Sequence, residues 1–387
     1  MNGRYVPMSV RRLIVSVELE GLNVAEFCRQ HGVGRTLFYD LRRRFAEEGE
    51  GALEFRSRAP QRVANRISAQ LEDRIVEWRK QLETQGLDAG PGTIAFHLWG
   101  AGIKPPSEAT IWRVLSRRGF VLPQPEKAPK HAYRSFAAAR ANECWQIDAT
   151  DWQLADGTLV KIINLIDDCT RLLVSSVAVR SCNTETAFSA FCAGAERWGW
   201  PACFLSDNAQ EFRSGLAAGV RPLGVEASHS RPYHPQTCGK VERFQQTEKK
   251  WLTVQPAADD LDELQTQLDR FTHIYNYQRP HRALGRRIPA QVYADTPKAG
   301  PADRPLDQPT TIHWVKVNNG VCYIGQRLGI SVTAAYTGQT AAVIITGANC
   351  HVFIAGKLVR QLHLDPTRRI QPIYPRRGQP PKAANHE

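Results

Sequence analysis

The chain has 387 residues and a formal net charge of +12. This length supplies core for two to four domains and excludes a single small module. No apolar run reaches the ~18 residues of a membrane span, and the nine cysteines, with no CxxC pair, indicate a reducing cytosol. We therefore expect a cytoplasmic protein with no membrane partner.

The charge is distributed unevenly along the chain. Residues 1–140 carry a net charge of +8, residues 141–260 carry −4, and residues 261–387 carry +8. An acidic centre between basic arms suits a cation-dependent catalyst whose flanks hold nucleic acid, because neutralising phosphates supplies most non-specific affinity. Ordinary solubilising charge is the alternative explanation.

Residues 8–48 predict three short helices in a helix-turn-helix pattern. The second helix begins at Asn23, with Glu26 three residues later as in a capping box, and a tight turn follows at Gly32-Val33-Gly34. Ordinary helical hairpins also give this pattern. The helix after the turn carries our candidate contacts to bases and phosphates, Arg35, Thr36, Tyr39, Arg42 and Arg43, followed by Arg44.

A second helical unit begins near Ser68, where Leu71, Ile75, Trp78 and Leu82 recur at spacings of three and four. After a turn at Gly102, Ser107 is the expected N-cap of a helix that carries Arg113 as a candidate DNA contact. Paired readers would lengthen the recognised DNA site. The alternative is that this unit only packs on the first unit or on the core.

The middle of the chain predicts a β-β-β-α-β order. Its elements are apolar runs at 143–149, 159–166 and 172–179, a helix at 183–199 capped by Asn183, and a strand at 202–206. Asp148 lies within the first run and Asp207 follows the last strand, while Glu242 lies on a helix that begins near Gly239. These three carboxylates could converge on one point.

Three converging carboxylates repel one another and raise one another's pKa unless cations neutralise them. An all-oxygen ligand set without His or Cys favours magnesium or manganese over zinc or copper. Two such ions could clamp the attacking and leaving oxygens of a phosphodiester. On the Glu242 helix, Val241, Phe244, Glu248 and Trp251 fall on one side. Lys240, Arg243 and Lys249 are candidate phosphate contacts, with a solvated basic face as the alternative.

A helix is expected from about Asp259 to Tyr277, and a Pro-rich stretch at 297–309 marks a further boundary. Beyond it, short β-prone runs broken by Gly and Asn predict a small β-barrel. These runs are 311–317, 321–324, 330–332, 341–345, 351–354 and 358–362.

Four sequence blocks resemble the signature blocks of DDE transposases of bacterial insertion sequences, the branch whose core resembles retroviral integrases. They are Trp145–Asp148, Ser206–Phe212, His234–Phe244, and Tyr275–Leu284 followed by Pro289–Tyr293. Asp207 and Glu242 are 35 positions apart, close to the separation in that family.

The resemblance implies a multidomain α+β protein with a ribonuclease-H-like core. We expect a helix-turn-helix domain at 1–57, a second helix-turn-helix or winged-helix-like domain at 67–122, a linker at 123–140, the integrase catalytic core at 141–296, a small β-barrel at 311–365 and a basic disordered tail at 366–387.

The resemblance also implies the chemistry. Asp148, Asp207 and Glu242 would be the catalytic and metal-binding residues, holding two Mg²⁺ ions for which Mn²⁺ substitutes. The protein would bind the terminal inverted repeats of its element as double-stranded DNA, cut there and join the ends to target DNA. It would act as a homodimer or higher oligomer on DNA, associated with the bacterial nucleoid. The alternatives are an inert DNA-binding regulator and a ribonuclease-H-like nuclease.

One position departs from the family pattern. The family usually has Gly after the Asp-Asn pair, and here the residue is Ala209. If the backbone needs a positive φ at this position, we expect Ala209 to strain it by about 1 kcal/mol or more.

Overall fold

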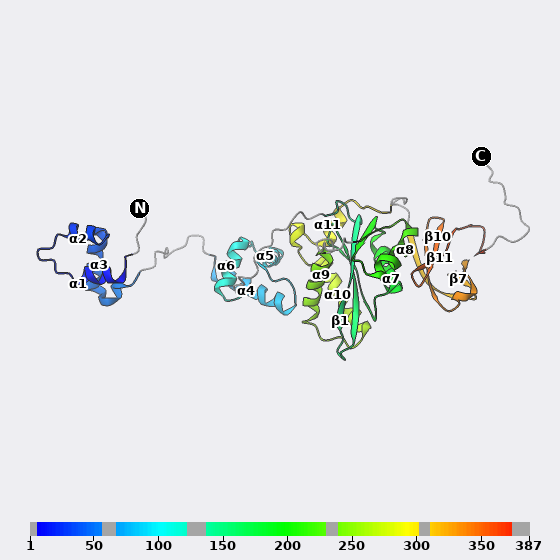
Figure 1. Cartoon of the computed structure of the whole chain (residues 1–387), viewed down its shortest axis with the longest axis horizontal. Coiled ribbons are helices and arrows are strands. Elements are labelled where there is room, and N and C mark those ends of the chain that lie inside the picture. Colours follow the sequence, from blue (N-terminus) through cyan, green and yellow to red (C-terminus); the bar gives the residue numbers. More distant parts are fainter. Residues whose placement is uncertain (1–5, 56–66, 122–136, 230–238, 302–309, 374–387) are drawn as a thin grey trace, which may run out of the picture. The chain divides into compact units, whose positions relative to one another are not determined.

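The computed structural model describes residues 6–55, 67–121, 137–229, 239–301 and 310–373. The chain divides into two compact units, residues 1–66 and 67–387, and each is described by itself (Figure 1). None of the described helices combines the length and apolar character that crossing a membrane requires.

The N-terminal unit contains the three helices predicted for residues 8–48. They are α1 (Met8–Ser16), α2 (Val24–Gln30) and α3 (Arg35–Glu48), followed by a 3-10 turn, η1 (Gly49–Leu53). Asn23 caps α2 by accepting a hydrogen bond from Glu26 N. The chain reverses at Gly32, whose φ of +64° suits glycine. Phe27, Phe38 and Leu41 form a buried core that belongs to this unit alone.

The second unit opens with another group of three helices, α4 (Ala69–Thr84), α5 (Pro91–Gly100) and α6 (Glu108–Arg117). Ser68 and Ser107 cap α4 and α6 through their side chains, as expected for Ser107. Buried Ile75, Ile94 and Ile111 join the three helices in one apolar cluster.

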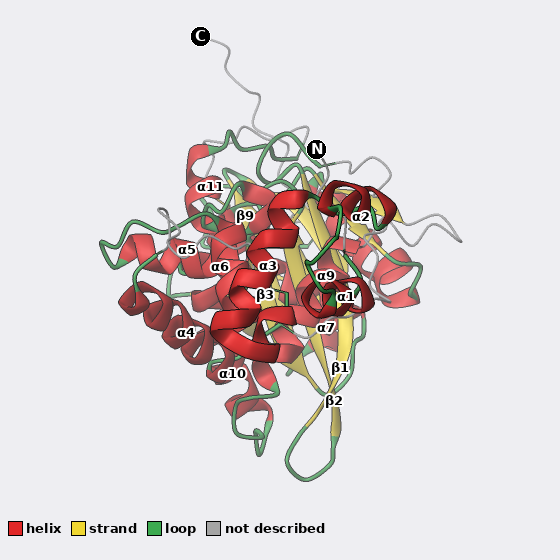
Figure 2. Ribbon diagram, turned by 90° about the vertical axis from the view of Figure 1, so that its left-hand side faces the viewer, coloured by secondary structure: helices red, strands yellow, loops and turns green. Residues whose placement is uncertain are grey.

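A five-stranded mixed sheet follows, with strand order β3-β2-β1-β4-β5. Its strands are β1 (Cys144–Gln153), β2 (Leu159–Asp167), β3 (Leu173–Val179), β4 (Cys203–Ser206) and β5 (Glu226–His229). Strand β2 is antiparallel to both of its neighbours, β1 and β3, and β4 runs parallel to both β1 and β5. Figure 2 shows β1 and β2 as a long hairpin. All but β5 were predicted from the apolar runs.

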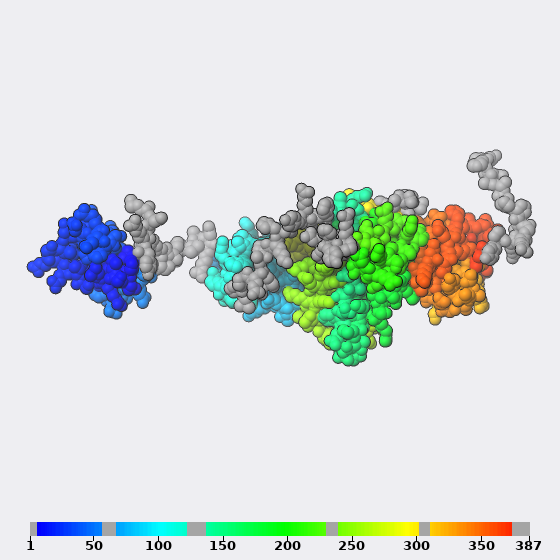
Figure 3. Space-filling model, viewed as in Figure 1, coloured from blue at the N-terminus to red at the C-terminus, as the bar shows by residue number. Residues whose placement is uncertain are grey.

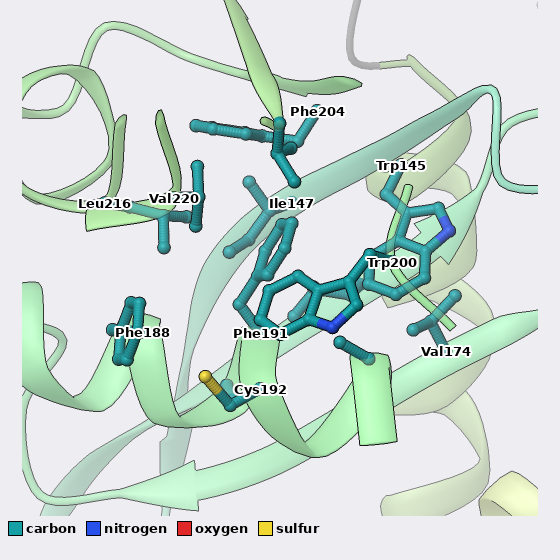
Figure 4. Close-up of a cluster of buried hydrophobic side chains, with 14 of the residues drawn as sticks. Trp145, Ile147, Val174, Phe188, Phe191, Cys192, Trp200, Phe204, Leu216 and Val220 are labelled. Carbon is teal, nitrogen blue, oxygen red and sulfur yellow. The ribbon is translucent and has the colours of Figure 1, made fainter. Parts of the chain in front are cut away.

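Helices cover both faces of this sheet (Figure 1). One face packs on α7 (Thr184–Trp198), which Asn183 caps as predicted, and on α8 (Ala217–Val220). Figure 4 shows the aromatic centre of that layer, including Trp145, Phe191 and Phe204. The other face packs on α9 (Gly239–Leu252) and α10 (Leu261–Tyr277). Short elements complete the unit: η2 (Glu211–Leu216), η3 (Arg221–Leu223), η4 (Arg282–Leu284), α11 (Pro289–Asp295) and η5 (Ala334–Tyr336).

The C-terminal strands form a seven-stranded sheet with the order β11-β10-β9-β6-β7-β8-β12. They are β6 (Thr310–Asn318), β7 (Val321–Ile324), β8 (Leu328–Ser331), β9 (Thr340–Thr346), β10 (Asn349–Ile354), β11 (Lys357–His363) and β12 (Ile370–Gln371). Within the described residues, no ladder pairs β11 with β12. Instead, Arg360 of β11 donates to Gln371 O at 2.9 Å and to Ser331 O. The strands are confirmed, whereas a closed barrel stays a prediction.

The C-terminal sheet and the α7 side of the five-stranded sheet share one apolar cluster. On the surface, the C-terminal strands, coloured orange to red, adjoin the green part of the chain (Figure 3). Ile312, Ile344 and Phe353 from the sheet are buried together with core residues of the α7 layer. The rings of Phe188 in α7 and Phe353 in β10 lie 4.8 Å apart between centroids.

Candidate active site

Strand register places two of the predicted carboxylates together. In the parallel β1–β4 pair, Gln146 lies opposite Leu205. The same register continued by two residues places Asp148 beside Asp207, the first residue after β4. Asp148 is half-buried and Asp207 is exposed.

Helix α9 carries the third carboxylate, Glu242, in its first turn, where the side chain is exposed. Two hydrogen bonds join this part of α9 to β1. Val241 N donates to Gln146 Oε1 at 3.2 Å, and Gln245 Nε2 donates to Asp148 Oδ2 at 3.1 Å. Glu242 lies between these two anchors, so the helix holds it at the same edge of the sheet as the aspartates.

The three carboxylates act on one another electrostatically. Burial raises the pKa of Asp148 to about 6, and the negative charges of Asp207 and Glu242 add to the increase. Hydrogen bonds from Ala149 N and Gln245 oppose it. Asp148 therefore holds its proton more tightly than an isolated aspartate does, as expected where like charges meet without a cation.

The donor chemistry of this cluster fits a hard divalent cation, because every candidate ligand is a carboxylate oxygen. The described part of the chain contains no group of three His, Cys, Asp or Glu residues arranged closely enough to hold a metal ion. The three carboxylates therefore influence one another electrostatically, but in the described residues they are not arranged as a metal-binding site.

Ala209 causes no backbone strain. It is absent from the described non-glycine residues with positive φ. Its N–H donates to Asp207 Oδ1 at 3.0 Å, and its carbonyl accepts from Arg213 N at 2.9 Å. The condition for the strain, a positive φ, is therefore not met, since the chain enters a helical turn here and a side chain is tolerated.

The basic residues predicted on α9 differ in their surroundings. Lys240 is half-buried and pairs with Asp168 Oδ1 at 2.5 Å, an oxygen that also accepts from Gln146 Nε2 at 2.7 Å. Burial lowers the pKa of Lys240. This ion pair gives Lys240 a structural partner in the core, and its predicted DNA contact stays a prediction. Arg243 is exposed and donates to Gln246 Oε1 at 2.8 Å, while Lys249 is half-buried.

The predicted DNA contacts on α3 also differ in their exposure and in their partners. Arg35, Thr36, Tyr39 and Arg43 are exposed, and Arg43 pairs with Asp40 at 2.8 Å.

Arg42 instead donates to Ile14 O at 2.9 Å and Val17 O at 2.6 Å. Arg42 thereby secures the C-terminal end of α1, and its predicted DNA contact stays a prediction. Arg44 is buried and donates to Ala52 O at 3.2 Å. In the second unit, Arg113 of α6 is exposed.

The block Tyr275–Leu284 has a structural role in the described residues. Asn276 binds both backbone groups of Leu173 in β3, each at 2.8 Å. Arg279 pairs with Asp88 at 2.5 Å, and Arg286, two residues beyond the block, pairs with Glu108 at 3.3 Å. These ion pairs join the α4–α6 group to the core, which supports the alternative that this group packs on the core.

The sequence interpretation also omitted side chains that hold the site. Gln146 and Gln245 orient α9 and Asp148, and Asp168 binds Lys240. Gln245 lies three residues after Glu242, the spacing of neighbours on a helix face, so helical periodicity could have identified it.

Comparison with known families follows from this geometry. The Integrase core domain family matches residues 138–235, and a second family of the same description matches residues 223–289. These matches, together with a relative from an insertion element, support the resemblance to integrase-like DDE transposases of insertion sequences. A Homeodomain-like domain family matches residues 38–115 of this chain, covering parts of both helical groups.

A curated relative is an uncharacterized 39.2 kDa protein of the insertion element IS476 from Xanthomonas euvesicatoria. It is 25% identical over 166 residues, covering 41% of this chain and 46% of the relative. The chain therefore spans about half the length of that relative.

Two viral integrase structures are similar at low scores. The HTLV-2 integrase catalytic core domain in complex with magnesium, in a trimeric form, is 18% identical with a TM-score of 0.33, covering 39% of this chain and 96% of that one. A simian T-cell lymphotropic virus intasome in complex with PP2A regulatory subunit B56 gamma is 16% identical with a TM-score of 0.38, covering 74% and 99%. Scores this low carry no argument here.

Proposed function

We propose that the protein binds the terminal inverted repeats of its insertion sequence and catalyses metal-dependent cleavage and strand transfer of DNA. The supporting observation is that Asp148, Asp207 and Glu242, from three elements of an integrase core, share one electrostatic field. The matches to integrase core domains support this class of chemistry, and the cluster supplies the acidic oxygens that such chemistry needs.

In this proposal, Asp148, Asp207 and Glu242 hold two Mg²⁺ ions, which Mn²⁺ can replace. Bound divalent ions would stabilise charge on the attacking and leaving oxygens of the phosphodiester. The chain itself orients the ligands. Ala149 N and Gln245 fix the two oxygens of Asp148, and Ala209 N fixes one oxygen of Asp207.

The DNA partners follow from the remaining parts. Exposed Arg35, Thr36 and Tyr39 of the N-terminal unit and Arg113 of α6 are the proposed DNA contacts in the helical groups. We retain the predicted domain division except at the C-terminal boundary, because β12 pairs with β8 inside the segment predicted as a disordered tail, 366–387. We propose that the C-terminal sheet is a small barrel. A homodimer or higher oligomer would hold both element ends, acting on chromosomal DNA in the bacterial cytoplasm.

An inert DNA-binding regulator was the main alternative, and Ala209 was its only support. Because Ala209 is unstrained and its N–H holds Asp207, this residue no longer favours inactivity.

The test is strand transfer by purified protein in Mg²⁺ on a duplex that carries the inverted repeat flanking its gene. Asp148→Asn and Glu242→Gln are expected to lower cutting and joining by at least about 100-fold, the scale of losing a group that acts on transition-state charge, while repeat binding persists. Asp151→Asn is the matched control, because Asp151 is an exposed aspartate of the same strand, paired with Lys161 at 2.8 Å.

Two results would contradict the proposal. Cutting at the wild-type rate by both variants would show that Asp148 and Glu242 are not catalytic residues. Tight repeat binding by the wild type without cutting in Mg²⁺ or Mn²⁺ would favour the regulator.

A further inference from the structure

A row of polar side chains crosses the sheet beneath α9. Asp148 of β1 lies opposite Asn164 of β2, and Asn164 lies opposite Ser176 of β3. Residues directly paired across neighbouring strands project from the same face of a sheet. Asn164 and Ser176 are buried, with exposed fractions of 0% and 6%, so the row runs from the candidate active site into the core.

Helix α9 binds this row with two side chains one turn apart. Gln245 donates to Asp148 Oδ2 at 3.1 Å. Glu248 accepts from Asn164 Nδ2 at 2.7 Å and from Ser176 Oγ at 2.9 Å. Glu242, Gln245 and Glu248 are spaced by three residues, so they follow one stripe of the helix. The exposed end of that stripe is the candidate catalytic carboxylate.

Burying a carboxyl group at the position of Glu248 costs free energy. Its side chain is completely buried among apolar residues of α9, including Phe244 and Trp251. A buried carboxyl group is tolerated only when its hydrogen bonds are satisfied. Asn164 Oδ1 has no hydrogen-bond partner within the described residues. Loss of Glu248 would therefore leave the whole Asn164 amide unsatisfied.

The free-energy cost of leaving these buried polar groups unsatisfied favours one alignment of α9 on the sheet. An apolar stripe can slide along a sheet with little change in energy, whereas buried polar partners are satisfied in one alignment. A shift of α9 by one turn would separate Glu248 from both Asn164 and Ser176 and would move Glu242 by the same distance. The Gln146 and Lys240 contacts fix the start of α9, and the polar row fixes its rotation.

We propose that Glu248 is a positioning residue that, through Asn164 and Ser176, sets the register of α9 and thereby the place of Glu242 beside Asp148 and Asp207. The part concerning Glu242 rests on the proposed function. The register itself does not depend on it.

Hydrogen exchange of α9 in the full-length protein tests the register directly. Glu248→Leu keeps the bulk and removes the two bonds, so amides of 239–252 are expected to exchange about tenfold faster, the scale of one lost buried hydrogen bond. Glu248→Gln, which retains hydrogen-bonding groups, is expected to stay within about threefold of wild type. Gln265→Leu is the matched control, because Gln265 of α10 also makes two bonds to β3, at 2.9 and 3.0 Å.

Metal binding and catalysis give the second readout. Glu248→Leu is expected to weaken Mn²⁺ binding, followed by titration of the protein's thermal shift, by about tenfold. It is expected to lower kcat for cutting with KM for DNA unchanged, and Glu248→Gln should restore both. Gln265→Leu should change neither.

The outcomes separate the two proposals. Wild-type protein that cuts no DNA would defeat the proposed function, while α9 exchange would still decide the register. Unchanged α9 exchange in Glu248→Leu, or equal acceleration in Gln265→Leu, would overturn the positioning role even in an active enzyme. If Glu248→Leu fails to fold, Ser176→Ala replaces it. That variant removes one of the two bonds, and wild-type exchange in it would also overturn the proposal.

Discussion

At the scale of single residues, Glu248 has a consequence for stability. Burial raises the pKa of Glu248 from its usual 4.5 to about 7, opposed by hydrogen bonds from Asn164 and Ser176 and by the charge of Lys249. Between these two values the folded protein binds more protons than the unfolded chain does. The free energy of unfolding therefore falls as pH rises through this window and levels off above about 7.

We expect this contribution to decrease by about 2 to 3 kcal/mol between pH 5 and pH 8, from 1.36 kcal/mol per pKa unit. Urea unfolding of the wild type and Glu248→Gln at both pH values measures it as the difference between the two proteins, because other groups titrate in both. Parallel changes in the two proteins would show that Glu248 does not titrate in this range.

Ala209 gives a second prediction at this scale. Since its φ is not positive, Ala209→Gly relieves no strain and adds backbone freedom to the unfolded chain. The variant is expected to cut DNA no faster than wild type and to be less stable by up to about 1 kcal/mol. A higher cutting rate at unchanged metal affinity would contradict this.

The sequence predicted the candidate catalytic residues but not the side chains that hold them in place. The motifs named the three carboxylates, but partners such as Asn164 depend on strand register, which a single sequence does not reveal. The structural partners of Lys240 and Arg42 were not predicted, for a physical reason. A basic residue in a helical pattern looks the same whether it faces solvent, a buried carboxylate or the carbonyl end of another helix.

At the scale of elements, apolar patterns predicted most of the longer helices and strands, but not α5, α8, α11, β5 or β12. Strand β5 was missed because Glu226–His229 is short, and its exposed, non-alternating residues give no apolar period. Its partner β4 was found because it is apolar. No sequence pattern identified Arg360, which links β11 to β8 and β12 through Ser331 O and Gln371 O.

Helix α1 depends on Arg42 of α3. Arg42→Ala leaves the carbonyls of Ile14 and Val17 without this donor and is expected to destabilise the N-terminal unit by about 1 to 3 kcal/mol. Hydrogen exchange of residues 8–16 in the full-length protein measures the effect. Arg43→Ala is the control, since its surface ion pair with Asp40 is worth at most about 1 kcal/mol. Unchanged hydrogen-exchange protection of residues 8–16 together with weaker DNA binding would show that Arg42 contacts DNA and does not support α1.

At the scale of the whole molecule, the apolar clusters show which parts depend on one another. The cluster around Phe27 and Phe38 contains only residues of the N-terminal unit. A chain that begins at residue 67 is therefore expected to melt within about 2 °C of the same transition in the full chain, while its affinity for the repeats falls. Calorimetry and repeat binding of the two chains test this, and loss of the core transition on removing residues 1–66 would refute it.

The C-terminal sheet is attached in a different way. Its Ile344 and Phe353 complete the cluster that contains Phe188 and Phe191 of the core. The backbones approach closely here, since a Cβ on Gly356, whose φ is +73°, would lie 2.9 Å from Thr184 O. The sheet is thus built into the same apolar interior as the strands that bear the aspartates. If the proposed function holds, a nucleotide bound to this sheet would lie at a fixed distance from the carboxylates of the proposed active site.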